Sequence, residues 1–159
     1  MGSVRVVTFE SQFAKAFADL NYEWIAKYYQ IEKHDHEQLD APYETIVESG
    51  GQIFFVLASD EVAGTVAMIR IEGNSFELAK MAVSPKFQGR KFGDLLMNAC
   101  VEFARSENAD SIILESNTKQ VAAIALYRKH GFLETPLDPN SQFSRANIRM
   151  ELAIKPNTR

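Results

Sequence analysis

The chain has 159 residues and a mass of 17.9 kDa, and its 46% hydrophobic content can build one core, so we expect a single domain over residues 1–159. The 17 basic and 21 acidic residues give a net charge of −4, which argues against a broad nucleic-acid-binding surface. No apolar run approaches the ~20 residues that span a bilayer, and no signal-peptide pattern opens the chain, so we expect a cytoplasmic protein without membrane contact.

The first half of the chain predicts a strand over residues 4–9 and a helix over residues 12–30. Residues 31–51 have the least regular pattern, with one short helix from Pro42 to Glu48 before the break at Gly50-Gly51. Three strands follow in succession, at residues 53–58, 62–71 and 76–83, separated by turn-like sequences.

The second half opens with the clearest helix, whose apolar residues from Phe92 to Phe103 fall three and four apart on one face. A short strand at residues 111–115, a helix at 121–130 and a last strand near 148–152 precede a polar tail. A helix between strands indicates parallel neighbours, so the fold class is α/β, with a mixed central β-sheet flanked by helices. The single cysteine, Cys100, lies on the apolar side of the first of these helices and is expected in the core, without disulfide or metal.

The turn at residues 83–93, Val-Ser-Pro-Lys-Phe-Gln-Gly-Arg-Lys-Phe-Gly, connects a strand to that helix. Free N–H groups at a helix N-terminus and the helix dipole favour a bound anion, and Arg90 and Lys91 add positive charge. Taken alone, the turn is equally compatible with a purely structural cap.

Two motifs resemble the GCN5-related N-acetyltransferase (GNAT) family. In its acetyl-CoA motif, Q/R-x-x-G-x-G/A, Gln88 and Gly93 match the first and last positions, and Lys91 replaces a glycine and is expected to keep helical backbone angles. Residues 123–132, Ala-Ile-Ala-Leu-Tyr-Arg-Lys-His-Gly-Phe, look like the family's A-I-x-L-Y-x-K-x-G-F ending. The resemblance implies the acetyl-CoA N-acyltransferase-like (GNAT) fold and acetyl-CoA as co-substrate, with no metal.

The resemblance also implies roles for single residues. The strand backbone at Met81, Ala82 and Val83 would pair with the pantetheine arm of acetyl-CoA. The pyrophosphate would lie on the turn formed by Gln88, Gly89, Arg90, Lys91, Phe92, Gly93 and Asp94. Asn117 and Ala123 would line the opposite wall, and Gln120 stands where the family often has an asparagine seven residues before its tyrosine.

Two residues are the candidates for catalysis. Tyr127 resembles the family's general acid, although an aromatic residue on a helical stripe is ordinarily a core residue. Glu77 is expected on the same strand face as Met81 and Val83, where some members carry a general base, or else as a solvent-facing carboxylate.

Further residues are candidates for the binding site of the acceptor. The sequence His34-Asp35-His36-Glu37 has metal-ligand residue types, but a solvated or substrate-rim loop is the favoured interpretation. The aromatic residues Tyr22, Trp24, Tyr28 and Tyr29 belong either to the acceptor wall or to the core. Residues 21–51 and 135–145 should frame the acceptor pocket.

The resulting hypothesis is an N-acetyltransferase that moves an acetyl group directly from acetyl-CoA to a primary amine of a small molecule, amino acid or peptide. The acidic balance favours a cationic acceptor. The alternatives are a non-catalytic acyl-CoA-binding or regulatory module and a protein lysine or N-terminal acetyltransferase. The terminal strands are the candidate surface for a homodimer.

Overall fold

The computed structural model describes residues 2–140 and 145–154 and contains one seven-stranded sheet. The strands are β1 (Val4–Thr8), β2 (Gln52–Ala58), β3 (Glu61–Ile71), β4 (Ser75–Val83), β5 (Ser111–Ser116), β6 (Leu133–Thr135) and β7 (Ile148–Ala153). The α-helices are α1 (Ala14–Tyr28), α2 (Lys33–Leu39), α3 (Phe92–Ser106) and α4 (Val121–Lys129). Three short helices complete the fold, namely the 3-10 helices η1 (Ser11–Phe13) and η3 (Pro85–Phe87) and the π-helix η2 (Tyr43–Val47).

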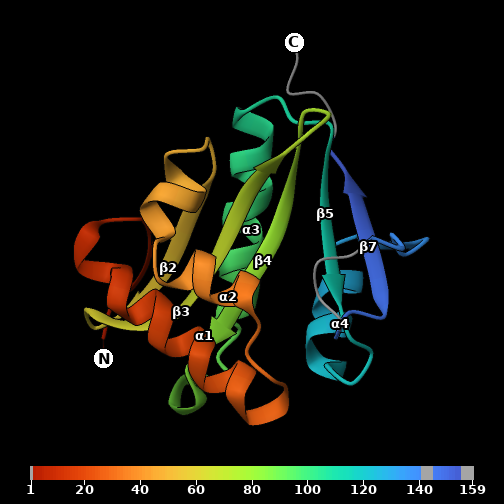
Figure 1. Cartoon of the computed structure of the whole chain (residues 1–159). Coiled ribbons are helices and arrows are strands. Elements are labelled where there is room, and N and C mark those ends of the chain that lie inside the picture. Colours follow the sequence, from red (N-terminus) through yellow and green to blue (C-terminus); the bar gives the residue numbers. More distant parts are fainter. Residues whose placement is uncertain (1, 141–144, 155–159) are drawn as a thin grey trace.

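The strand order is β1-β2-β3-β4-β5-β7-β6, and only β4 and β5 run parallel. The expected mixed sheet is therefore confirmed. The β4–β5 pairing extends over Ser75–Glu77 and Ser111–Ile113 alone. Beyond these residues the two strands diverge, so that the second half of β4 has no β5 residue beside it (Figure 1).

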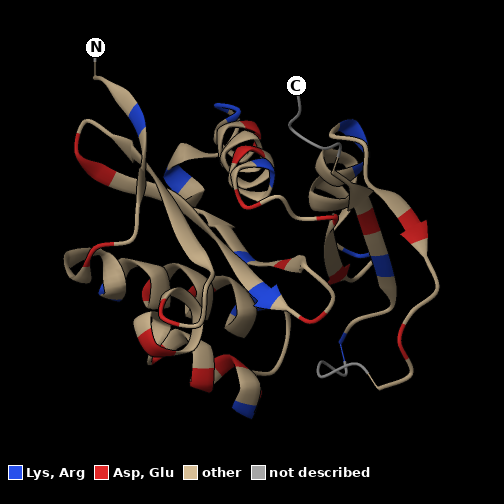
Figure 2. Cartoon of the chain, turned by 90° about the horizontal axis from the view of Figure 1, so that it is seen from above, with Lys and Arg blue, Asp and Glu red and all other residues tan. Residues whose placement is uncertain are grey.

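Helices cover both faces of the sheet, as the view from above shows (Figure 2). Strand β2 is buried on both faces, because Phe54 and Val56 pack on the α3 side while Ile53 and Phe55 pack on the α1 side. The continuous apolar run of this strand is the sequence pattern that such two-sided burial requires.

Residues 31–39 differ from the irregular segment that the sequence predicted, because they contain helix α2. A capping box holds its start: the side chain of Glu32 accepts from the backbone at Asp35, and Asp35 accepts from the backbone N–H of Glu32 at 2.9 Å. Strand β6 was also not predicted, and it pairs only with β7. Residues 141–144 of the expected acceptor frame and the predicted tail at 155–159 lie outside the described residues.

Strand β4 carries a bulge that changes which face its side chains take. Ala79 stands opposite Ala67 and Ala82 opposite Thr65, so β4 has one extra residue there, and Lys80 has a left-handed φ of 56°. As a result Met81 and Val83 pack with Phe76 and Leu78 on the α3 side. Glu77 lies on the other face, which corrects the expectation that it shares a face with Met81 and Val83.

The described helices include none long and apolar enough to cross a membrane. Basic and acidic residues are interspersed along the described elements (Figure 2).

Candidate active site

A cleft of about 620 Å³ opens where β4 and β5 diverge. It runs from the turn before α3, past α4 and the second half of β4, to the end of α1 and the residues just before β7. Of the residues predicted to bind cofactor or to act in catalysis, the structure brings together Glu77, Met81, Ala82, Val83, Gln88, Gly89, Lys91, Phe92, Gly93, Asp94, Asn117, Ala123 and Tyr127 around this cleft. Arg90 is the predicted residue that does not line it.

The turn between η3 and α3 presents its backbone to the cleft. Gly89 has a φ of 84°, and a Cβ there would meet nothing within 4 Å, so this part of the turn is open to an incoming group. Lys91 is the N-cap residue and has φ 64° and ψ 26°, which corrects the expectation of ordinary helical angles: the lysine takes the left-handed conformation that a glycine adopts without strain. The N–H groups that open α3 can therefore hold a pyrophosphate.

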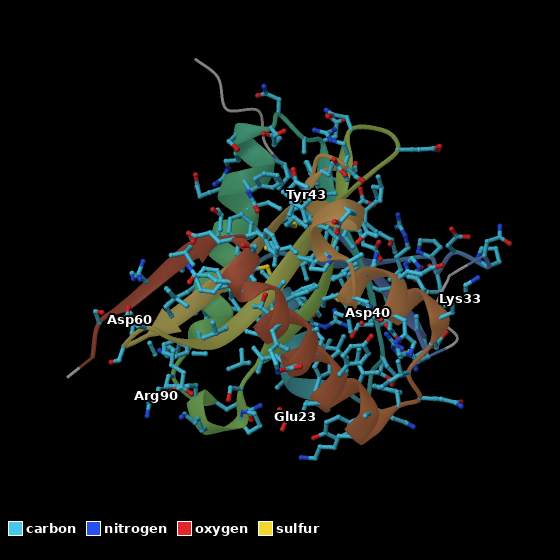
Figure 3. All side chains as sticks on the ribbon, turned by 60° about the vertical axis from the view of Figure 1, so that its left-hand side comes forward. Glu23, Lys33, Asp40, Tyr43, Asp60 and Arg90 are labelled. Atoms are coloured by element: carbon cyan, nitrogen blue, oxygen red, sulfur yellow. The ribbon has the colours of Figure 1, made fainter. Side chains whose placement is uncertain are left out.

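Charged side chains around this turn have separate roles. The guanidinium of Arg90 packs 5.4 Å from the centre of the Phe87 ring, and Figure 3 shows Arg90 at the edge of the molecule. Lys91 is the basic residue of the turn that lines the cleft. Asp94 at the start of α3 accepts from Lys129 and His130, each at 2.8 Å, and these bonds lower the pKa of its carboxyl and offset its negative charge.

Helix α4 supplies the wall that carries Tyr127. The helix approaches α3 closely, because a Cβ on Gly93 would lie 3.0 Å from Leu126 Cδ2. Tyr127 is 7% exposed, and among the described residues no hydrogen-bond partner is found for its hydroxyl. Burial raises its pKa to about 12, so the phenol stays protonated at neutral pH and can donate a proton into the cleft.

Glu77 enters the cleft from β4. Burial is the main cause that raises the pKa of its carboxyl, the nearby Glu115 raises it further, and Lys80 opposes both. A carboxylate with a raised pKa is a stronger base than an exposed one, which is the property that a general base needs near neutral pH.

The cleft is also aromatic and charged. Trp24, Tyr28 and Tyr29 line it together with Glu77 and Glu115. Tyr22 does not line it, since its hydroxyl contacts Asp40 and His36 near the surface at 2.6 and 2.7 Å. Three of the four candidate aromatic residues therefore line the cleft.

Sequence reasoning missed three residues in this region. Lys80 and Arg145 line the cleft, and both bind Asp35, which is completely buried. Asp35 was predicted to lie in a solvated or substrate-rim loop, but it is a buried residue of helix α2. The sequence signal that could have found it is the Glu32–Asp35 spacing of a capping box.

The other candidate features have simpler roles. Cys100 lies on the buried face of α3 in the core, as predicted, and burial raises the pKa of its thiol. Gln120 Nε2 donates to the hydroxyl of Tyr29 at 3.3 Å. Within residues 2–140 and 145–154, no group of three or more His, Cys, Asp or Glu side chains could hold a metal ion.

Known proteins share the sequence pattern and the fold of this chain. The model of the acetyltransferase (GNAT) family matches residues 18–132. An uncharacterized N-acetyltransferase of Bacillus subtilis, YvbK, is 27% identical over 110 residues, which are 67% of this chain and 71% of that protein. Among solved structures, a GNAT acetyltransferase from Staphylococcus aureus Mu50 has a TM-score of 0.87 at 19% identity and covers 96% of this chain and 100% of its own. Spermidine N-acetyltransferase from Vibrio cholerae, solved with CoA and spermine, has a TM-score of 0.72 at 20% identity and covers 95% of each chain.

The sheet that opens between two strands, the cleft at that opening and the likeness to these solved structures define the GNAT fold. The chain belongs to the GNAT family and is an acetyl-CoA-dependent N-acetyltransferase.

Proposed function

We propose that this protein transfers the acetyl group directly to a primary amine of a small molecule, amino acid or peptide, with Glu77 as general base and Tyr127 as general acid. The observation that carries the proposal is that both groups line one cleft from different elements, β4 and α4. The free edge of β4 at Met81, Ala82 and Val83 suits the pantetheine arm, and the turn from Gln88 to Asp94 with Asn117 and Ala123 suits the rest of the co-substrate.

These two side chains supply the proton transfers that the reaction needs. Glu77 takes a proton from the acceptor ammonium, directly or through water, which frees the nitrogen lone pair. The nitrogen then forms a bond to the acetyl carbonyl carbon while the bond between this carbon and the CoA sulfur breaks. Tyr127 donates its proton to the departing sulfur and regains one from solvent as the new amide nitrogen loses its second proton.

The charges at the acceptor end support a cationic acceptor. Glu77 and Glu115 line this end, and the cations of Lys80 and Arg145 are bonded to Asp35. The aromatic rings of Trp24, Tyr28 and Tyr29 add faces that attract cations.

A panel of amines tests the assignment of Tyr127. Spermidine, phenethylamine, lysine and a lysine-containing peptide are offered with acetyl-CoA, and CoA release is measured. Tyr127→Phe should lower kcat by about 10²-fold or more while the Kd for acetyl-CoA stays within about twofold, because only the proton donor is lost. Tyr43→Phe is the matched control, since Tyr43 is exposed on η2 and does not line the cleft.

Two other outcomes of the amine panel would favour a different function. No turnover by the unmodified protein with any amine or peptide would contradict the proposal and favour an acyl-CoA-binding module. Turnover confined to the peptide would favour a protein acetyltransferase. We also propose that residues 1–159 act as one N-acetyltransferase domain, which the family match over residues 18–132 supports.

A further inference from the structure

Three segments far apart in the sequence meet in one buried ion bridge. Lys80 Nζ donates to Asp35 Oδ1 at 2.6 Å, and the Arg145 guanidinium donates to both oxygens of Asp35 at 2.7 and 2.9 Å. Arg145 also reaches Glu32 at 3.3 Å. Asp35 comes from α2, Lys80 from the bulge in β4, and Arg145 from the residues just before β7.

The bridge keeps its charge despite its burial. The Asp35 side chain is 0% exposed and that of Lys80 is 3% exposed. Burial alone would raise the pKa of Asp35, but the bonds from Arg145, Lys80 and the Glu32 backbone hold it well below its usual value. A buried ion pair adds little net stability compared with apolar packing. The main effect of the bridge is therefore to hold its three segments in fixed positions.

The bridge crosses the opening between the two parts of the sheet. Asp35 and Lys80 belong to the part that ends with β4. Arg145 belongs to the part that begins with β5, because its carbonyl accepts from Asn117 Nδ2 at 2.7 Å and the neighbouring Asn147 donates from its backbone to Ser116 at 2.9 Å. The β4–β5 pairing ends at Glu77, so Arg145 joins the two walls where backbone pairing no longer does.

The same arginine also supports the aromatic wall of the cleft. Its guanidinium lies 5.9 Å above the ring of Tyr29, whose ring in turn stands edge-on to Trp24 with 6.3 Å between ring centres. Trp24, Tyr29 and Arg145 all line the cleft, as Glu77 does.

We propose that Arg145 is a positioning residue: its two bonds to Asp35 hold the walls of the cleft together at the proposed acceptor end and fix the aromatic wall formed by Trp24 and Tyr29. The part of this inference that concerns the acceptor rests on the proposed function. The structural part does not.

The structural part is tested without turnover, because Trp24 is the one tryptophan of the chain and lines the acceptor end. Arg145→Met should raise the acrylamide quenching constant of Trp24 by about twofold, as local opening exposes the ring. Arg149→Met is the matched control: Arg149 lies on β7, bonds Thr135 and Glu151, and does not line the cleft. Equal quenching in both variants and the unmodified protein would overturn the proposal.

The kinetic part is tested with whichever panel amine is turned over. Arg145→Met should raise the acceptor KM by about 10-fold and leave the Kd for acetyl-CoA within about twofold, and Arg145→Lys should recover part of the loss. A loss confined to acceptors that carry a carboxylate would overturn the proposal, because Arg145 would then contact the acceptor itself. If Arg145→Met does not fold, the same comparisons are made with Arg145→Lys and Arg149→Lys. Absence of turnover in the unmodified protein would count against the proposed function, while the quenching result would still decide the bridge.

Discussion

At the scale of single residues, Lys91 combines a functional position with backbone strain. Its left-handed conformation costs an L-residue roughly 1–2 kcal/mol, and glycine avoids this cost. Lys91→Gly and Lys91→Ala both remove the ammonium group, so their difference isolates the backbone. We expect the glycine variant to be more stable than the alanine variant by about 1 kcal/mol in urea unfolding.

Lys86 provides the matched control for this pair. It is an exposed lysine in η3 without a left-handed φ. The order should invert there, with Lys86→Ala more stable than Lys86→Gly. If the alanine variant were more stable than the glycine variant at Lys91 as well, the backbone of Lys91 would not be strained.

The pH dependence of the reaction tests the proposed role of Glu77 as general base. A general base acts when deprotonated, so kcat/KM is expected to rise with pH through the raised pKa of Glu77. Glu115 contributes to that raised pKa through its negative charge. Glu115→Gln removes the charge and should move the rising limb to lower pH.

The control for this shift is Glu134→Gln, which alters an exposed carboxylate on β6 away from the cleft and should leave the profile unchanged. A rising limb that stays in place in Glu115→Gln, or that persists in Glu77→Gln, would assign the titration to another group.

Single residues also show how far the sequence could predict the site. Tyr127 was predicted from a motif that is local in the chain, and Glu77 from its position six residues before Val83; both line the cleft, although the bulge in β4 puts Glu77 on the other strand face. Asp35 was missed because its partners, Lys80 and Arg145, are 45 and 110 positions away. A pattern of neighbouring charges cannot reveal that a carboxylate is neutralised by tertiary contacts.

At the scale of elements, the closeness of α3 and α4 depends on Gly93. Inside a helix alanine is ordinarily favoured over glycine by about 1 kcal/mol, but here its Cβ would lie 3.0 Å from Leu126 Cδ2. We expect Gly93→Ala to be more favourable by about 1 kcal/mol in a Leu126→Ala background than in the unmodified protein. Thermal unfolding of the four proteins measures this coupling, and strictly additive effects would show that the helices do not meet there.

Elements whose pattern is local and complete were predicted well. Strand β2 and helix α3 have an apolar run and an apolar stripe that match their burial in the structure. Helix α2 was missed because its seven residues are mostly polar, and only Leu39 supplies a large buried apolar side chain. Strand β6 was missed because its three residues are fixed by pairing with β7, not by their own pattern.

At the scale of the whole molecule, the sheet consists of two parts that share only a short parallel pairing. Helix α3 packs beneath both parts, a buried hydroxyl contact joins Ser75 and Ser111 at 2.8 Å, and the bond from Arg145 to Asp35 joins the two parts beside the cleft. The sequence predicted the mixed sheet from the order of its elements. It could not predict the opening, because an early end of strand pairing leaves no local pattern in either strand.

This arrangement predicts how a ligand that fills the cleft acts on unfolding. Such a ligand contacts β4 and the start of α3 on one side and α4 on the other, so it binds the folded state alone and links the two parts. At a concentration of one hundred times Kd it should add ~2.7 kcal/mol, which raises the Tm of a chain of this size by roughly 5–10 °C. Thermal unfolding with saturating acetyl-CoA measures the rise, with ATP and NAD as anionic controls. An equal rise with ATP would show that the turn before α3 binds any phosphate, whereas a rise with acetyl-CoA alone would support the proposed contact between the pantetheine arm and the free edge of β4.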